Sequence, residues 1–224
     1  MALLNRRTMV LGVSATLAGC VGEPMGGPAL QTRRFDPSLV AHYGPIDDEP
    51  FPIPAVDLAT VEPHVLRREV PDPTGERPGT IVVDPTSRFA FLVMEDRRAL
   101  RYGVGVGRES AFNFVGEATI ARKAKWPSWR PTPAMIAREP ERYGPLADGL
   151  PGGLGNPLGP RALYFYRNGR DTYYRLHGTV EPQTIGTTVS SGCVRLFNQD
   201  IIDLYRRVPV GTRVVVLPIG QSLV

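Results

Sequence analysis

The pattern of apolar and polar residues divides the chain near residue 79. After this point, β-branched and aromatic runs alternate with short turn-forming clusters, a pattern typical of strands. Before it, prolines recur and few apolar periods are sustained. The strands expected from the pattern are 80–84, 88–94, 98–105, 162–166, 172–176 and 212–218. Many short strands with few helices predict a mainly β fold, either a sandwich or a barrel.

The strands at 162–166 and 172–176 have the clearest connection. Asn168-Gly169 lies between them, and this dipeptide is the strongest short-range signal for a hairpin. His177 directly follows the second strand. The hairpin would therefore place an imidazole at the end of a strand, where a base can face a groove.

Two short helices are expected in the same half of the chain. Residues 133–139 begin with proline, which is favoured in the first turn of a helix. In the second helix, Asn198–Arg207, the side chain of Asn198 can cap the N-terminus. The apolar face of this helix consists of Ile201, Ile202, Leu204 and Tyr205.

Residues 21–78 are predicted to form a proline-rich tether or extended arm. Proline removes backbone donors and disfavours both helices and central strands. Two parts of the segment, 51–54 and 61–70, are apolar enough to pack on the domain or to form one short helix. His42 and His64 also lie here and are expected to be ordinary exposed residues.

The first 20 residues predict export from the cytoplasm. A basic stretch at 1–7 precedes an apolar stretch at 8–19, which is too short to span a bilayer and suits a signal peptide. Arg6-Arg7 resembles a twin-arginine export signal, with general export as the alternative. Leu17-Ala18-Gly19-Cys20 resembles a bacterial lipobox, in which cleavage leaves Cys20 lipidated. The expected location is the periplasm or cell envelope, as a membrane-anchored lipoprotein.

The charge and composition exclude several function classes. The formal net charge is +4, and basic pairs are scattered rather than interleaved with aromatic residues, which disfavours nucleic-acid binding. A basic groove would suit an anionic polymer such as a cell-wall glycopeptide. The chain has only three histidines and two cysteines, without zinc-like ligand spacing. Neither a metal nor another cofactor is expected.

Cys193 is the candidate nucleophile. Once Cys20 is lipidated or removed with the leader, Cys193 has no partner for a disulfide, and a single free thiol in an oxidising compartment indicates a reactive role. Small residues precede it, Ser190-Ser191-Gly192, so the backbone can turn tightly and leave the sulfur open. A thiol needs a neighbouring base to become a nucleophile, and His177 is the histidine available in the patterned half.

Several motifs together resemble one family. His177-Gly178-Thr179, Pro182, Ile185-Gly186 and the run 190–196 are similar to the signature of the L,D-transpeptidases, the YkuD catalytic domain. Further segments match in the same order, namely Ile81–Asp84, 126–131, 151–153, 156–159 and 211–214. The resemblance covers about residues 79–218 and implies a YkuD-like β-sandwich or barrel.

The resemblance also implies a reaction. His177 would be the general base, oriented by the backbone carbonyl of Gly178. Cys193 would attack the bond between residues three and four of a peptidoglycan stem peptide, release D-alanine and pass the acyl group to an amine. The backbone amides of Gly192 and Cys193 would stabilise the oxyanion. Many family members carry a second histidine where this chain has Ser191, so Ser191 is assigned only a supporting role.

The remaining assignments concern substrate binding, and alternatives stay open. Arg195 would either bind a substrate carboxylate or support the loop of Cys193. Ser190, Ser191 and Trp129 are further candidates for substrate contacts, although packing in the core is the favoured alternative for Trp126, Trp129 and Tyr143. An L,D-carboxypeptidase that uses water as the acceptor needs the same residues. A peptidoglycan-binding module without catalysis is a further alternative, which the presence of Cys193, His177 and Arg195 disfavours. The sequence does not identify the acyl acceptor. The expected partners are stem peptides and, through Cys20, the membrane.

Overall fold

One mixed sheet organises the part of the chain that the computed structural model describes, residues 35–107, 114–190 and 192–224. Its strands pair in the order β1 (Arg68–Pro71), β4 (Arg98–Gly103), β3 (Phe89–Val93), β2 (Ile81–Asp84), β11 (Arg213–Val216), β6 (Gly116–Lys125), β7 (Arg161–Arg167), β8 (Arg170–His177) and β10 (Val194–Arg195). The pairs β11–β2 and β10–β8 are parallel, and the others are antiparallel. A second, small sheet pairs β5 (Val106–Gly107) with β9 (Thr188–Ser190).

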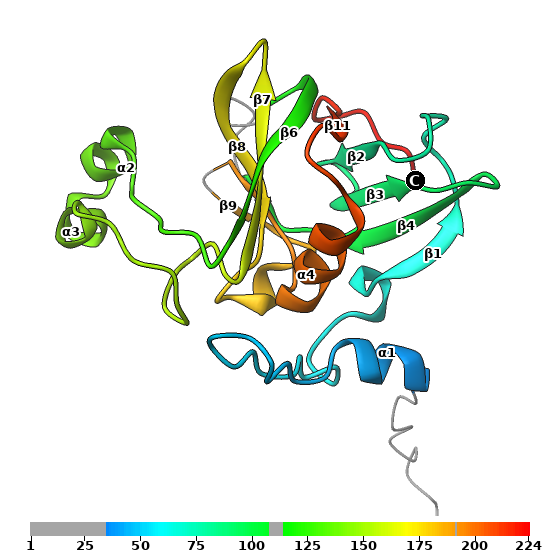
Figure 1. The fold of residues 1–224 in the computed structure, drawn as a ribbon, viewed down its shortest axis with the longest axis horizontal. Coiled ribbons are helices and arrows are strands. Elements are labelled where there is room, and N and C mark those ends of the chain that lie inside the picture. Colours follow the sequence, from blue (N-terminus) through cyan, green and yellow to red (C-terminus); the bar gives the residue numbers. More distant parts are fainter. Residues whose placement is uncertain (1–34, 108–113, 191) are drawn as a thin grey trace, which may run out of the picture. The chain divides into compact units, whose positions relative to one another are not determined.

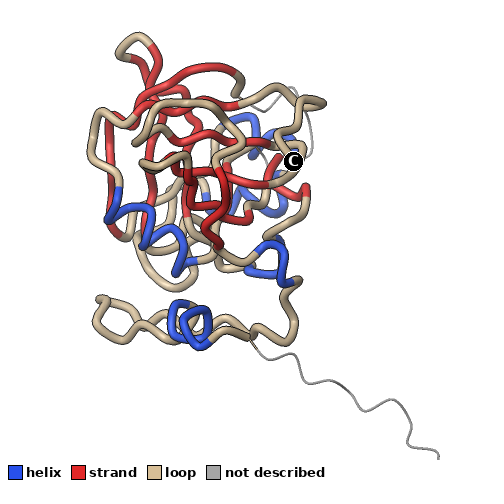
Figure 2. The backbone as a smooth tube through the Cα atoms, turned by 90° about the vertical axis from the view of Figure 1, so that its right-hand side faces the viewer, coloured by secondary structure: helices blue, strands red, loops and turns tan. Residues whose placement is uncertain are grey.

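The helices are short and lie around the strands (Figure 1; Figure 2). They are α1 (Pro37–His42), α2 (Pro133–Arg138), α3 (Pro140–Tyr143) and α4 (Asn198–Arg207), with 3-10 turns at Pro63–Val65, Gly144–Leu146 and Pro182–Thr184. No helix in the described ranges has the length and apolar character needed to cross a bilayer. The mainly β fold expected from the sequence is confirmed.

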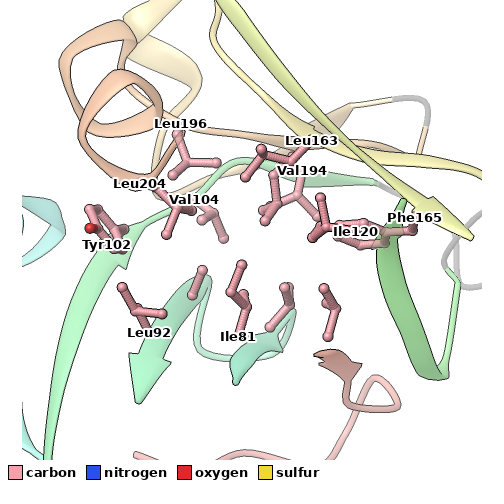
Figure 3. Packing of buried hydrophobic residues seen from close by; sticks show 14 of the residues in the cluster. Ile81, Leu92, Tyr102, Val104, Ile120, Leu163, Phe165, Val194, Leu196 and Leu204 are labelled. Atoms are coloured by element: carbon pink, nitrogen blue, oxygen red, sulfur yellow. The ribbon is translucent and has the colours of Figure 1, made fainter. Parts of the chain in front are cut away.

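The main core lies between the two halves of the curved sheet. Ile81 of β2, Leu92 of β3 and Tyr102 of β4 pack in one cluster with Leu163 of β7 and Leu204 of α4 (Figure 3). The alternate residues of β2, β3 and β4, including Val82 and Phe91, belong to a second cluster on the other face of the sheet. Strands buried on both faces read as continuous apolar runs, which is why the sequence pattern located β2 and β3 so closely.

The sequence pattern did not predict strand β6, although it is ten residues long and central in the sheet. Its sequence, GEATIARKAK, buries only Ala118 and Ile120 fully, and its other side chains are exposed or half-buried. Alanine, lysine and arginine favour helices, so local propensity opposes the strand. Pairing with β7 and β11 outweighs that preference.

Residues 126–160 leave the sheet between β6 and β7 and carry α2 and α3, the green elements to one side of the sheet (Figure 1). Helix α2 confirms the expected helix at 133–139, and its N-terminus is capped by Thr132, whose hydroxyl accepts from the Met135 N–H at 3.2 Å. We call residues 126–160 the excursion. The buried side-chain amide of Asn156 fixes its two ends to each other by donating to Pro127 O at 3.0 Å and Pro151 O at 2.9 Å. The excursion is therefore an ordered loop.

Residues 35–78, the described part of the segment 21–78 predicted as a tether or extended arm, pack on the domain, as the alternative for 51–54 and 61–70 allowed. Tyr43, Val65 and Leu66 are buried in a cluster with Ile185 and Phe197 of the domain. Strand β1 extends the sheet beside β4, and an isolated bridge joins Ile46 to Ile53. Prolines interrupt the apolar residues of this segment, so the sequence shows no periodic pattern. Tyr43, Val65 and Leu66 are nevertheless buried. We call residues 35–78 the docked arm.

Several polar side-chain contacts tie the docked arm to the domain. Glu49 forms an ion pair with Arg161 of β7, and both side chains are almost fully buried. His42 is half-buried rather than exposed, which corrects the expectation, because its Nε2 lies 2.8 Å from Oδ1 of the buried Asp200. His64 is exposed, as expected. Residues 1–34, with Cys20 and the expected signal peptide, lie outside the described residues.

Candidate active site

The parallel strands β8 and β10 place the candidate base and nucleophile on one side of the sheet. Their register pairs His177 with Arg195 and Leu176 with Val194. Side chains alternate between the two faces of a strand, so Leu176 and Val194 point into the core, where both are buried. His177 and Arg195 consequently point to the opposite face. Cys193 directly precedes β10, and its Sγ lies 3.7 Å from the carbonyl oxygen of Tyr173 on β8.

The imidazole of His177 is held by the backbone. Its Nδ1 lies 2.6 Å from the carbonyl oxygen of Gly178. A carbonyl oxygen can only accept a hydrogen bond, so Nδ1 carries the proton and Nε2 of the neutral ring is the basic nitrogen. The position of the residue itself is fixed by Leu196, whose N–H donates to His177 O at 2.8 Å. The expected role of Gly178 as the group that orients the base agrees with this geometry.

Burial sets the charge of both groups. Desolvation, assisted by the positive charges of Arg175 and Arg195, lowers the pKa of His177 to about 3, although its bond to Gly178 acts in the opposite direction. Burial raises the pKa of the Cys193 thiol, and the nearby Arg175 guanidinium only partly offsets this. At neutral pH the site therefore holds a neutral imidazole and a neutral thiol.

Both groups open onto a cavity of about 460 Å³. Residues from the excursion form one wall, with Trp129 and Tyr143 at a ring-centroid distance of 6.2 Å. Trp129 thus lies where a substrate contact was expected. Trp126 does not line this cavity, and its Nε1 donates to Oε2 of Glu49 at 2.9 Å. The lining is rich in positive charge, because it contains one acidic residue, Glu181, and five arginines, Arg130, Arg138, Arg142, Arg175 and Arg195.

Arg195 has a structural partner as well as a place in the cavity. Its Nη1 lies 2.6 Å from Oε2 of Glu181 and 3.4 Å from Oγ1 of Thr184, and its side chain is 17% exposed. The guanidinium therefore supports the segment that follows His177. The two roles that the sequence left open for Arg195, support of a loop and contact with substrate, are compatible in this position.

The small residues before Cys193 differ in their structural environment. Gly192 is buried and has a φ of 129°, a conformation that favours glycine, so a side chain at this position would be strained. Ser190 ends β9, where it is registered with Gly107 of β5. Ser191 lies outside the described residues.

Three residues near the site were not assigned to it from the sequence. Tyr173 and Arg175 share the strand face of His177 at two-residue spacing, a signal that the sequence did contain. Tyr173 has a φ of 60° beside an irregularity in the β7–β8 pairing. The sequence contains no residue that would predict this irregularity. Asn198 does not cap α4, contrary to expectation. Its Oδ1 accepts instead from the Thr179 N–H at 2.9 Å.

These observations define a class of protein, a mainly β domain with a cysteine–histidine site. The buried histidine is oriented by a carbonyl and shares its cavity with the cysteine. No group of metal-ligating side chains is present in the described ranges. Residues 78–216 match the model of the YkuD family, the L,D-transpeptidase catalytic domain. The chain belongs to this family, and the resemblance inferred from the motifs is confirmed.

Individual relatives are consistent with this assignment. The probable L,D-transpeptidase ErfK/SrfK of Escherichia coli strain K12 is 35% identical over 148 residues, which are 65% of this chain and 46% of that protein. The probable L,D-transpeptidase YbiS of the same strain is 41% identical over 116 residues, 51% of this chain and 36% of that protein. The chain thus spans less than half the length of these curated relatives.

Two solved structures are also similar to this chain. A Brucella melitensis protein named as a probable carnitine operon oxidoreductase is 49% identical, covers 70% of this chain and 97% of its own, and has a TM-score of 0.48. L,D-transpeptidase 3 from Mycobacterium tuberculosis is 16% identical, covers 61% of this chain and 60% of its own, and has a TM-score of 0.45.

Proposed function

We propose that this protein is a peptidoglycan L,D-transpeptidase with Cys193 as its nucleophile and His177 as its general base. One observation supports the proposal most strongly. His177 is neutral, its Nδ1 is engaged by Gly178 O at 2.6 Å, and it shares a cavity with the Cys193 thiol. A neutral imidazole with a free Nε2 is the form that can remove a proton from a thiol.

The first half-reaction forms a thioester. Nε2 of His177 takes the proton of the Cys193 thiol as sulfur attacks the carbonyl carbon between residues three and four of the stem peptide. The carbon–nitrogen bond of the tetrahedral intermediate then breaks, and the imidazolium returns its proton to the departing amine of D-alanine. The backbone amides of Gly192 and Cys193 hold the oxyanion, and the positive charge of Arg175 favours the anionic sulfur.

The second half-reaction transfers the acyl group. An acceptor amine loses its proton to His177 and attacks the thioester carbon. The carbon–sulfur bond breaks, and the thiolate recovers the proton from the imidazolium. A second stem peptide gives a 3-3 cross-link, and a protein lysine gives protein attachment. Water in the same place would give L,D-carboxypeptidase activity.

Electrostatics support an anionic substrate. Five arginines contribute to the cavity that contains Cys193 and His177. Stem peptides carry carboxylates, for which guanidinium groups are suitable partners. Trp129 at the wall offers an apolar surface to the stem. Ser190 and Ser191, whose side chains are not described, keep their proposed supporting contacts.

We further propose that residues 1–20 direct export and that Cys20 carries the lipid. The catalytic domain would be 79–218, with the docked arm as its N-terminal support and residues 21–34 as the connection to the anchor. The enzyme would then act in the periplasm or cell envelope, within reach of the cell wall.

The test is product analysis with a defined substrate. The purified protein would be incubated with a disaccharide-tetrapeptide, and free D-alanine and cross-linked dimer would be measured by mass spectrometry, with a Cys193→Ala variant as the control. D-alanine and dimer that depend on Cys193 are expected. D-alanine with tripeptide and no dimer would indicate a carboxypeptidase. Binding without D-alanine release by a folded protein would contradict enzymatic function and favour a binding module.

A further inference from the structure

A single peptide group links Asn198 to the candidate base. The carbonyl of Gly178 accepts from Nδ1 of His177 at 2.6 Å, and the N–H of Thr179 donates to Oδ1 of Asn198 at 2.9 Å. This carbonyl and this N–H belong to the same peptide bond. Because a peptide group is planar, with its oxygen and hydrogen on opposite sides, its orientation toward one partner fixes its orientation toward the other.

The amide of Asn198 is itself held in place. Gly178 and Gly159 lie against it so closely that a Cβ on either residue would collide with Oδ1. Asn198 begins α4, and the residues on either side, Phe197 and Gln199, are buried. The acceptor is therefore fixed on a rigid element, whereas the Gly178–Thr179 peptide would lose one of its two anchors without it. This close approach also explains why glycine occupies position 178 next to the base.

We propose that Asn198 is a positioning residue that orients the imidazole of His177 through the Gly178–Thr179 peptide group. The inference deepens the proposed function and rests on His177 being the base in it. Two hydrogen bonds connect Asn198 to the ring, one from the Thr179 N–H to Asn198 and one from the ring to the Gly178 oxygen. It keeps the Gly178 oxygen in line with Nδ1, and so keeps the proton on Nδ1 and Nε2 directed to the thiol. A similar arrangement with a carboxylate is the usual way to fix a catalytic histidine.

Two substitutions separate this role from general support. Asn198→Ala removes the acceptor, whereas Asn198→Asp retains an oxygen that can accept from the Thr179 N–H. We expect the first-order rate of acylation by a tetrapeptide stem to fall up to about 100-fold in Asn198→Ala, with KM within about twofold of wild type. Asn198→Asp should recover most of the rate. Gln199→Ala is the matched control, because Gln199 is the next residue of α4 but donates to Gly44 O and Pro54 O of the docked arm.

A spectroscopic measurement tests the same inference without turnover. In protein labelled with ¹⁵N-histidine, the Nδ1-bound proton of His177 should give a distinct, slowly exchanging signal in wild type, in Asn198→Asp and in Gln199→Ala. In Asn198→Ala the signal should broaden or disappear as the ring samples both tautomers. Should Asn198→Ala fail to fold, Asn198→Asp and Asn198→Ser provide the comparison, since the shorter serine cannot reach the Thr179 N–H.

The outcomes distinguish this inference from the proposed function. An unchanged acylation rate and an unchanged Nδ1 proton signal in Asn198→Ala, with wild-type protein active, would overturn the positioning role alone. A wild-type protein that is never acylated by stem peptides, but loses the Nδ1 signal in Asn198→Ala, would overturn the proposed function and leave the positioning role in place.

Discussion

His177 and Gly178 are neighbours in sequence, and the carbonyl oxygen of the second lies 2.6 Å from Nδ1 of the first. The histidine is thus oriented by the backbone of the adjacent residue, and no carboxylate takes that part. A neutral carbonyl fixes the tautomer but adds no negative charge that would favour an imidazolium. Burial and two nearby arginines keep the ring neutral, against the opposite effect of the bond to Gly178 on the pKa of His177. The pair therefore fixes the tautomer of the base, and the surroundings fix its charge.

The first prediction concerns the reactivity of the thiol. The pKa of Cys193 is raised by burial and that of His177 is lowered to about 3, so neither group changes charge between pH 5 and 8. The rate of alkylation of Cys193 by iodoacetamide should rise with pH and continue to rise beyond pH 9, without a plateau near neutrality. His177→Gln should leave the profile below pH 8 almost unchanged. A plateau reached by pH 7 that His177→Gln abolishes would instead indicate a thiolate–imidazolium pair.

The second prediction concerns stability. In the unfolded chain His177 has a pKa of about 6.5, whereas in the fold its pKa is about 3. The unfolded state therefore binds more protons between these values, and stability is lost as the pH falls below 6.5. From pH 7 to pH 5 this contribution amounts to about 2 kcal/mol. Urea unfolding should show that wild type loses about 2 kcal/mol more than His177→Gln over this range. Equal losses in both proteins would show that His177 titrates normally in the fold.

A third prediction concerns Arg175, whose positive charge lowers the pKa of Cys193 against the effect of burial. Arg175→Gln should raise the thiol pKa further, and so lower the alkylation rate at pH 8. Acylation by a stem peptide should fall at least as much, because the same charge favours the anionic sulfur in the reaction. Arg68→Gln, at an exposed position on β1, is the matched charge control and should change neither rate. Equal rates for Arg175→Gln and wild type would show that this charge does not act on the sulfur.

The fourth prediction tests whether the docked arm is part of the folding unit. Leu66 is 2% exposed and packs with residues of the domain, so Leu66→Ala should lower the free energy of unfolding by about 2–4 kcal/mol. Unfolding should remain a single cooperative transition. Leu154→Ala, at a residue that is 55% exposed, should change stability by less than about 0.5 kcal/mol. A loss below about 1 kcal/mol in Leu66→Ala would mean that the arm detaches at little cost.

The sequence predicted those parts of the fold in which local pattern and tertiary environment agree. β2 and β3 are apolar throughout because both of their faces are buried, and α4 has an apolar face and occupies the expected residues. The pattern failed where distant pairing decides. β6 is a strand in spite of its alanines and lysines because β7 and β11 flank it. The docked arm is ordered because single apolar side chains between prolines meet sites on the domain.

The candidate site shows the same division. Cys193, His177 and Gly178 were recognised from motifs. The structure places Cys193 and His177 at one cavity and joins His177 to Gly178 by a hydrogen bond. The role of Asn198 could not be predicted, because its partner is 19 residues earlier in the chain and helix capping was the simpler local expectation. The ion pair of Arg195 with Glu181 likewise depends on the fold.

The most direct test of the central claim, acyl transfer through Cys193, is the intact mass of the protein after incubation with a tetrapeptide stem. We expect an adduct equal to the stem minus D-alanine on the wild-type protein, mapped to Cys193 by peptide digestion and missing from Cys193→Ala. A correctly folded wild-type protein that gains no adduct and releases no D-alanine would contradict the account.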